Sequence, residues 1–192
     1  MSSSGAGERF AIGAHVEATD GRCGHLARVI VDPVAESLTH LVVEPGRHKE
    51  RARIVPVELV VGVEDDRIRL SCTKEEFERL DPAEDIRFLP AETPTYLADD
   101  MPLGRGHEPM YIDRVPLGEV AIRRGDPVHA RDGEIGAVKG LVIDPVDHDV
   151  THVILQEGHL WGRKQVAIPI GAANRVGDEM TSRKTRSKRC HR

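Results

Sequence analysis

The sequence predicts a mainly β protein made of two similar small modules in tandem, because one pattern of strands and turns occurs twice. The matching segments run from Asp20 to Val57 in the first copy and from Asp132 to Ile170 in the second. The offset between them is 112 residues and becomes 113 at the last match, so one residue has been added to a hairpin. A repeat this long is a whole folding unit and not a solenoid turn, which predicts two domains.

The expected boundaries follow from the repeat and from composition. We predict a disordered N-terminus at 1–11, a first module at 12–89, a proline-rich linker at 90–116, a second module at 117–179 and a disordered basic tail at 180–192. The linker is assigned because prolines and Asp-Asp and Gly-rich stretches interrupt regular structure. Its short apolar segments, Tyr96-Leu97 and Met110-Tyr111-Ile112, could still add edge strands or lie across a barrel. Modules of this size are near the lower limit for independent stability, so we expect the two to pack on each other.

Turn residues recur at equivalent positions of both copies. Asp-Gly pairs suit tight hairpin turns with positive φ, and the glycine three residues later is typical of a bulge or a close approach of two backbones. An Asp-Pro pair then ends the second strand, because proline has no amide donor and fixes a turn dihedral. These structural residues are Asp20, Gly21, Gly24, Asp32 and Pro33 in the first copy and Asp132, Gly133, Gly136, Asp144 and Pro145 in the second.

Each copy is expected to form about five short antiparallel strands, a set that favours a small, partly open barrel. The first copy closes with a helix, since Thr73-Lys74-Glu75-Glu76 has the form of a capping box and Phe77 and Leu80 share a face. In the second copy the residues aligned with Ile68 and Leu70 are Thr181 and Arg183. The second module is therefore expected to lack its last strand and helix.

Charge is distributed unevenly along the chain. The net charge is −5, but six basic residues and no acid occupy the last ten positions, which leaves 21 basic and 32 acidic residues, or −11, elsewhere. An acidic body is a poor match for phosphate backbones, whereas the tail could contact nucleic acid or acidic lipid. The alternative is a solvated terminus without a ligand.

The cysteines and the apolar runs indicate a cytoplasmic protein. Cys23, Cys72 and Cys190 are an odd number without a CxxC pair, which predicts reduced thiols and neither a disulfide framework nor a zinc site. No apolar run reaches the ~20 residues that span a bilayer, and residues 1–10 do not resemble a signal peptide.

No catalytic, cofactor-binding or metal-binding residues are predicted. His40 and His152 are equivalent but lack HxH or HExxH spacing, so we interpret them as structural or exposed strand residues. A strand and not a helix follows each DGxxG glycine pair, which favours a turn over a phosphate cradle. Leu160 and Trp161, in a hairpin tip, are possible contact residues if exposed; otherwise they cover one end of the barrel.

The assembled motifs resemble the PRC-barrel family. They are DGxxG, a Val/Ile-rich strand into Asp-Pro, a Thr-His-hydrophobic-hydrophobic strand and an aliphatic-Pro-aliphatic strand, in the same order in both copies. This family includes the cytoplasmic domain of the photosynthetic reaction-centre H subunit and the C-terminal domain of a ribosome maturation factor. The resemblance covers residues ~12–89 and ~117–179. It implies small barrels used for protein contacts, without shared catalytic residues.

The function expected from these observations is a non-enzymatic cytoplasmic module for protein interaction or assembly. Its partner would be an unidentified protein or a second copy, with no small-molecule substrate and no integral membrane segment. Two alternatives stay open: an RNA-associated or ribosome-maturation factor acting through the basic tail, and a support protein like the reaction-centre H subunit.

Overall fold

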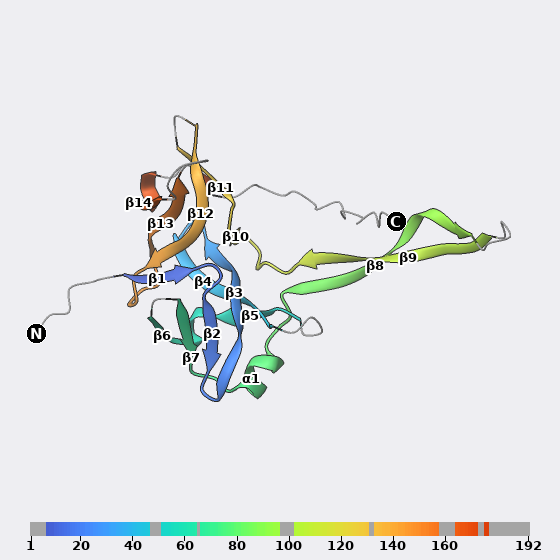
Figure 1. Cartoon of the computed structure of the whole chain (residues 1–192), viewed down its shortest axis with the longest axis horizontal. Coiled ribbons are helices and arrows are strands. Elements are labelled where there is room, and N and C mark those ends of the chain that lie inside the picture. The colour runs from blue at the N-terminus through green and yellow to red at the C-terminus, as the bar shows by residue number, and fades with distance from the viewer. Residues whose placement is uncertain are drawn as a thin grey trace, which may run out of the picture. The chain divides into compact units, whose positions relative to one another are not determined.

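A computed structural model gives the fold for residues 7–46, 51–64, 66–96, 102–130, 133–157, 164–172 and 175–176. The protein is mainly β, as expected from the sequence. It divides into two compact units (Figure 1). The first contains both repeats, within residues 1–83 and 115–179, and the second contains residues 84–114 between them.

The elements of the repeats follow each other at nearly constant offset. In the first repeat they are β1 (Glu8–Ala11), β2 (His15–Ala18), β3 (Gly21–Asp32), β4 (Ser37–Glu44), β5 (Arg53–Pro56), the 3-10 helix η1 (Val57–Leu59), β6 (Val60–Glu64), β7 (Arg67–Leu70) and the helix α1 (Lys74–Arg79). In the second they are β10 (Val120–Arg123), β11 (Pro127–Ala130), β12 (Gly133–Ile143), β13 (Val150–Glu157), β14 (Lys164–Pro169), the 3-10 helix η2 (Ile170–Ala172) and β15 (Arg175–Val176).

Each repeat builds a sheet around its own long hairpin. The strand order is β5-β4-β3-β2-β7-β6 in the first sheet and β14-β13-β12-β11-β15 in the second. All pairs are antiparallel except β2 with β7. Within the part of the chain that the structure describes, both sheets are open and no closed barrel is present.

The two repeats exchange their first strands. β1 of the first repeat pairs with β12 of the second, and β10 of the second pairs with β3 of the first. The registers are equivalent, since Phe10 lies opposite Leu141 and Ile122 lies opposite Val29. The exchange is therefore reciprocal, and it relates the two repeats by an approximate two-fold axis.

Residues 8–11 were expected to belong to a disordered N-terminus, but they form β1. The segment is too short for its own periodicity to mark it as a strand, and its partner lies more than 100 residues away in the sequence. Phe10 is 1% exposed, so β1 contributes a core residue as well as ladder hydrogen bonds.

One hydrophobic core is shared by both repeats. Its buried side chains are mainly Val, Leu and Ile and come from the strands of each copy. Those that are fully buried and largest include Phe10, Leu26, Leu41, Ile68, Leu70, Leu141, Ile143 and Leu155. Burial of a branched aliphatic side chain contributes roughly 1.5–3 kcal/mol, so sharing one core gives both small repeats a stability that neither core would give alone.

The DGxxG glycines lie where two backbones come close. Gly21 has φ +135°, a conformation that favours glycine. A Cβ on Gly24 would lie 2.2 Å from the carbonyl oxygen of Glu44, and one on Gly136 would lie 2.9 Å from that of Gln156. The register of the first hairpin shifts beside both glycines, so the long strands bend there.

Helix α1 is short and is held at its start by two side chains. Thr73 accepts a hydrogen bond from the Glu76 amide, and the Glu76 carboxylate accepts one from the Thr73 amide, which completes the capping box. The hydrogen bonds that the Thr73 amide and hydroxyl donate to the Glu76 carboxylate lower the pKa of Glu76. The Asp20 carboxylate accepts from the Lys74 amide at 2.9 Å, which fixes α1 to the first hairpin turn, while Phe77 is buried.

The segment between the repeats forms an antiparallel ribbon of two long strands. These are β8 (Glu84–Tyr96) and β9 (Pro102–Asp113), which pair from Glu84 with Asp113 to Tyr96 with Pro102. Residues 90–116 were expected to be an irregular linker because of their prolines. A two-stranded ribbon accepts proline more readily than the middle of a sheet, because each strand has a free edge on which no amide donor is needed.

The second repeat ends differently from the first. After η2 the next described element is β15, which pairs antiparallel with β11 and places Val176 opposite Val128. In the first repeat the equivalent residue Val16 lies opposite Ile68 of β7, in a parallel pair. The place of β7 is therefore taken by a two-residue strand. The predicted loss of the last strand and helix concerns residues from 177 onward, which lie outside the described part.

Candidate functional site

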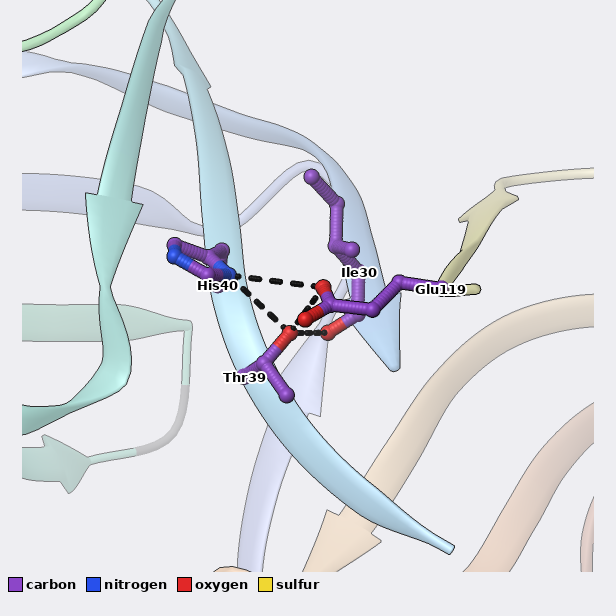
Figure 2. Close-up of polar contacts among 4 residues, drawn as sticks. All are labelled: Ile30, Thr39, His40 and Glu119. Carbon is purple, nitrogen blue, oxygen red and sulfur yellow. Dashed lines mark hydrogen bonds and ion pairs between the residues drawn. The ribbon is translucent and has the colours of Figure 1, made fainter. Parts of the chain in front are cut away.

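Thr39, His40 and Glu119 form a polar cluster where the two repeats meet (Figure 2). Thr39 and His40 lie on β4, and Glu119 directly precedes the exchanged strand β10. β3 lies between these strands, since Ile30 is opposite both His40 and Ala121. The side chains of His40 and Glu119 are 27% and 17% exposed, so the cluster is half-buried.

A tight turn places the Glu119 carboxylate. The Glu119 amide donates to the carbonyl of Pro116 at 3.1 Å, and Gly118 between them has φ +88°. This geometry is that of a type II turn, which needs a residue with positive φ at its third position. The glycine therefore allows the chain to reverse immediately before β10, and Glu119 points back over β3 towards β4.

The hydrogen bonds of the cluster assign its protons. Thr39 Oγ1 lies 2.6 Å from Glu119 Oε2 and 3.1 Å from the carbonyl oxygen of Ile30, and both oxygens are acceptors, so the hydroxyl directs its single hydrogen to this pair. His40 Nδ1 lies 3.0 Å from the same hydroxyl oxygen, whose only hydrogen is already used, so Nδ1 carries a hydrogen and donates to it. We therefore assign the Nδ1–H form of His40, with Nδ1 also 3.5 Å from Glu119 Oε2.

The second repeat contains the same threonine and histidine without the carboxylate. Thr151 Oγ1 donates to the carbonyl of Val142 at 3.0 Å, and His152 Nδ1 lies 3.1 Å from Thr151 Oγ1. The residue equivalent to Glu119 is Gly7, and a Cβ there would lie 2.6 Å from a methyl group of Val142. A side chain at Gly7 would require Val142 to shift, and with glycine at this position the carboxylate cluster exists on one side of the two-fold axis only.

The cluster can hold strands of the two repeats together through hydrogen bonds. A hydrogen bond to a charged acceptor is stronger than one between neutral groups, so Glu119 holds β10 of one repeat to β4 of the other. His40 and Glu119 supply two potential metal ligands, whereas structural metal sites use four. In the described residues, no three His, Cys, Asp or Glu side chains are grouped so that they could hold a metal ion.

The sequence-predicted turn residues occupy turns or bends of the long hairpins. Asp32 Oδ1 accepts from the amides of Val34 and Ala35, and Asp144 Oδ1 accepts from the amide of Val146. These carboxylates are thereby committed to their own turns and are not brought together. Asp132, Leu160, Trp161 and Cys190 lie outside the described residues.

Glu119 was not among the residues singled out from sequence. The available signal is the difference between the copies: at the constant offset, Glu119 aligns with Gly7, while Thr39 and His40 align with Thr151 and His152. The flanking positions differ as well, since Glu8, Arg9 and Ala11 align with Val120, Ala121 and Arg123, so the sequence comparison by itself does not separate Glu119 from its neighbours.

Cys23 and Cys72 both lie near the first hairpin turn. Cys72 is buried and Cys23 is half-buried, and the amide of Thr19 donates to the Cys72 carbonyl at 3.0 Å. Burial raises the pKa of both thiols. A raised pKa keeps a thiol protonated at neutral pH, which opposes a role as nucleophile.

Comparison with known proteins found no match, either to models of protein families or to curated proteins. In the described part of the chain, no helix has both the length and the apolar character needed to cross a membrane.

Proposed function

We propose that this protein is a non-catalytic module for protein interaction, of the PRC-barrel type, and that the β8–β9 ribbon is its contact element. The observation that carries the proposal is that the ribbon is a separate compact unit between two repeats that complete each other. Figure 1 shows the two long strands of the ribbon as a ladder of their own.

The exchanged strands of the repeats are paired inside the chain, whereas the ribbon pairs with no described strand of the repeats, which makes the ribbon a candidate for external contacts. Exchange of β1 and β10 pairs both strands inside the chain, and the shared core buries apolar residues of both copies. In contrast, β8 and β9 pair only with each other among the described strands. A two-stranded ribbon is only marginally stable in water, so contact with another surface would stabilise it.

The PRC-barrel assignment is supported by the order of strands in the two copies. Both copies contain the same three structural features in the order of the sequence motifs. These are a bent long hairpin, a turn at Asp-Pro and a strand that begins near Thr-His. The assignment predicts a role in protein contacts and supplies no catalytic residues to test.

A deletion of the ribbon tests the contact element. Glu84 and Asp113 are opposite each other in the ladder, so a two-residue Asn-Gly turn can replace residues 85–112. The flanking residues Ala83 and Val115 pack against the same small cluster, which contains Ile30 and Val42, so both chain ends stay anchored. We expect this variant to keep the unfolding midpoint of the repeats.

The partner is sought with a photo-reactive amino acid at Thr95 of the ribbon, expressed in cells of the source organism. The matched control carries the same probe at the exposed Glu78 of α1. We expect one reproducible adduct from position 95 only, and loss of binding of that purified partner to the ribbon deletion. A partner that binds the deletion variant as tightly as the full chain would exclude the ribbon as contact element.

A second candidate function is RNA binding, favoured by the six basic residues between Arg183 and Arg192. Phosphate contacts by these residues would make the affinity strongly dependent on salt. Deletion of residues 181–192 is expected to abolish such binding. An RNA affinity that is unchanged by the deletion, or absent in the full chain, rejects this candidate.

A further inference from the structure

Five apolar residues lie on the surface where the exchanged strand β10 begins. Val34 is 91% exposed in the turn between β3 and β4, and Pro33 and Ala35 on either side of it are exposed as well. Leu117 is 106% exposed in the turn before β10, and Val120 at the start of that strand is also exposed. We call these five residues the apolar patch.

The strand exchange brings the two turns of the patch together, although they are far apart in the sequence. β10 runs antiparallel to β3, and Val120 lies opposite Val31 near the end of β3. The residues before Val120 therefore extend past the end of β3, and Leu117 lies beside the turn that carries Val34. Each repeat thus contributes one turn to the patch.

The equivalent positions of the other copy are less apolar. Val146 repeats the exposed valine of the turn, whereas the residues equivalent to Leu117 and Val120 are Gly5 and Glu8. A single exposed aliphatic side chain is ordinary on a protein surface, but a contiguous group is typical of a contact surface. The patch is therefore a feature of one side of the approximate two-fold axis, and Val146 is a matched single residue for experiments.

The charges around the patch indicate the chemistry of its ligand. The segments that form it, 29–46 and 115–122, contain no lysine or arginine. The carboxylates beside the patch are those of Asp32, Glu36 and Glu119. In the described part of the chain, none of these three carboxylates forms an ion pair with a lysine or arginine. Their negative charge attracts cations, so the fitting ligand combines aliphatic side chains with positive charge.

The same charges act against two other occupants. A second copy in a symmetric contact would bring the carboxylates beside the patch against their own copies, and like charges repel. A membrane surface with anionic lipids would be repelled in the same way. A basic polypeptide gains both from contact with the apolar side chains and from the surrounding charge.

We propose that the apolar patch binds a basic segment of another protein that also carries aliphatic side chains. These side chains cover Val34 and Leu117, and the lysine or arginine side chains of the segment pair with the surrounding carboxylates. The patch has five residues, whereas a standard interface has about 20–30 on each side, so the contact is weak and transient. It is a second contact surface, and it does not rest on the proposed role of the ribbon.

Titration of the isotope-labelled full-length chain with a synthetic peptide, followed by NMR, tests the proposal. The probe is a short amphipathic helix of leucine and lysine, and the matched probe has glutamate in place of lysine. We expect the leucine–lysine peptide to shift the amide signals of Val34, Gly118 and Val120 until they saturate. The leucine–glutamate peptide should leave these signals unchanged.

Single substitutions locate the binding site. Val34→Ser and Leu117→Ser should each weaken binding of the leucine–lysine peptide about fivefold, because each removes an aliphatic contact. Val146→Ser is the matched control, since it changes a similarly exposed valine in the equivalent turn, and it should alter the affinity by less than about twofold. All three side chains are exposed, so the unfolding midpoints of the variants should equal that of the unchanged chain.

Three outcomes would overturn the proposal. Unchanged affinity in Leu117→Ser, or equal weakening in Val146→Ser, would show that net charge alone holds the peptide. A dimer that Leu117→Ser dissociates, measured by sedimentation equilibrium, would place a second copy on the patch. Binding to vesicles of phosphatidylcholine and phosphatidylglycerol that Leu117→Ser abolishes would place a membrane there. None of these measurements involves the ribbon, so failure here and failure of the proposed function are distinguishable.

Discussion

Glu36 and His148 are equivalent residues of the two repeats, and each gives its backbone carbonyl to the other repeat. The Val150 amide donates to Glu36 at 2.7 Å, and the Leu38 amide donates to His148 at 2.9 Å. Glu36 has φ 55° and His148 has φ 64°, and in the described part they are the only non-glycine residues with positive φ. The left-handed conformation costs roughly 1–2 kcal/mol per residue, and these hydrogen bonds offset it. The strain is thus located where the repeats join.

Glycine at either position should remove this strain. We expect Glu36→Gly and His148→Gly to leave the free energy of unfolding unchanged or to raise it by up to about 1 kcal/mol, because glycine adopts positive φ without a steric cost. Glu36→Val should lower it by about 1–2 kcal/mol. Urea denaturation measures these changes. The control is Ala35→Gly, at an exposed neighbour without positive φ, which should be destabilising; equal losses at all three glycine variants would contradict the explanation.

The hydrogen bond between Thr39 and Glu119 predicts an energetic coupling that the equivalent threonine of the second repeat lacks. In a double-mutant cycle, Thr39→Val and Glu119→Ala should show a coupling energy of about 1 kcal/mol, because their hydrogen bond is charge-assisted but the site is partly solvated. The matched cycle combines Glu119→Ala with Thr151→Val, the equivalent threonine without a carboxylate. Its coupling should lie within about 0.3–0.5 kcal/mol of zero, the usual limit for independent sites. Similar coupling in both cycles would show that Glu119 does not act through Thr39.

The duplication allowed the order of the strands to be predicted, but not how the repeats are joined. β2 and β10 both lie along the edge of β3 that β4 leaves free, and a sequence pattern states which face of a strand is buried and not which strand pairs with it. The four residues of β1 and their partners in β12 are separated by most of the chain. The reciprocal exchange of strands depends on pairing between distant segments, so it could not be predicted from local periodicity.

The candidate site was predictable in part for a related reason. Thr39 and His40 stand out because they recur, but recurrence directs attention to what the copies share. Glu119 matters because its counterpart is Gly7, and the reason for that glycine, the close approach of Val142, exists only in three dimensions. Only short edge strands were considered in this segment, because prolines normally argue against strands, an argument that is weak for a ladder with two free edges. The length of β8 and β9 and their pairing with each other were not predicted.

The raised pKa values of the thiols predict slow alkylation and a loss of stability at alkaline pH. Folding favours the protonated thiols of Cys23 and Cys72, so their contribution is complete below the ordinary thiol pKa of about 8.5 and declines as the pH rises through the raised folded values. Iodoacetamide labelling followed by mass spectrometry should modify both residues more slowly at pH 8 than in the urea-unfolded chain. Rates that are the same in the folded and unfolded chains would contradict this.

The strand exchange makes a prediction at Gly140, which faces β1. A Cβ at this position would lie 2.3 Å from the carbonyl oxygen of Phe10 and 3.0 Å from the Cα of Ala11, both in the backbone of the exchanged strand. Gly140→Ala must therefore push β1 away from β12, and we expect it to lower the free energy of unfolding by about 1–3 kcal/mol. Gly171→Ala is the control, because a Cβ there meets nothing within 4 Å. Hydrogen exchange should accelerate at the amides of β1 in Gly140→Ala and remain slow in the β13–β14 ladder. If both alanine variants were equally stable and protected, β1 would not lie on β12 in solution.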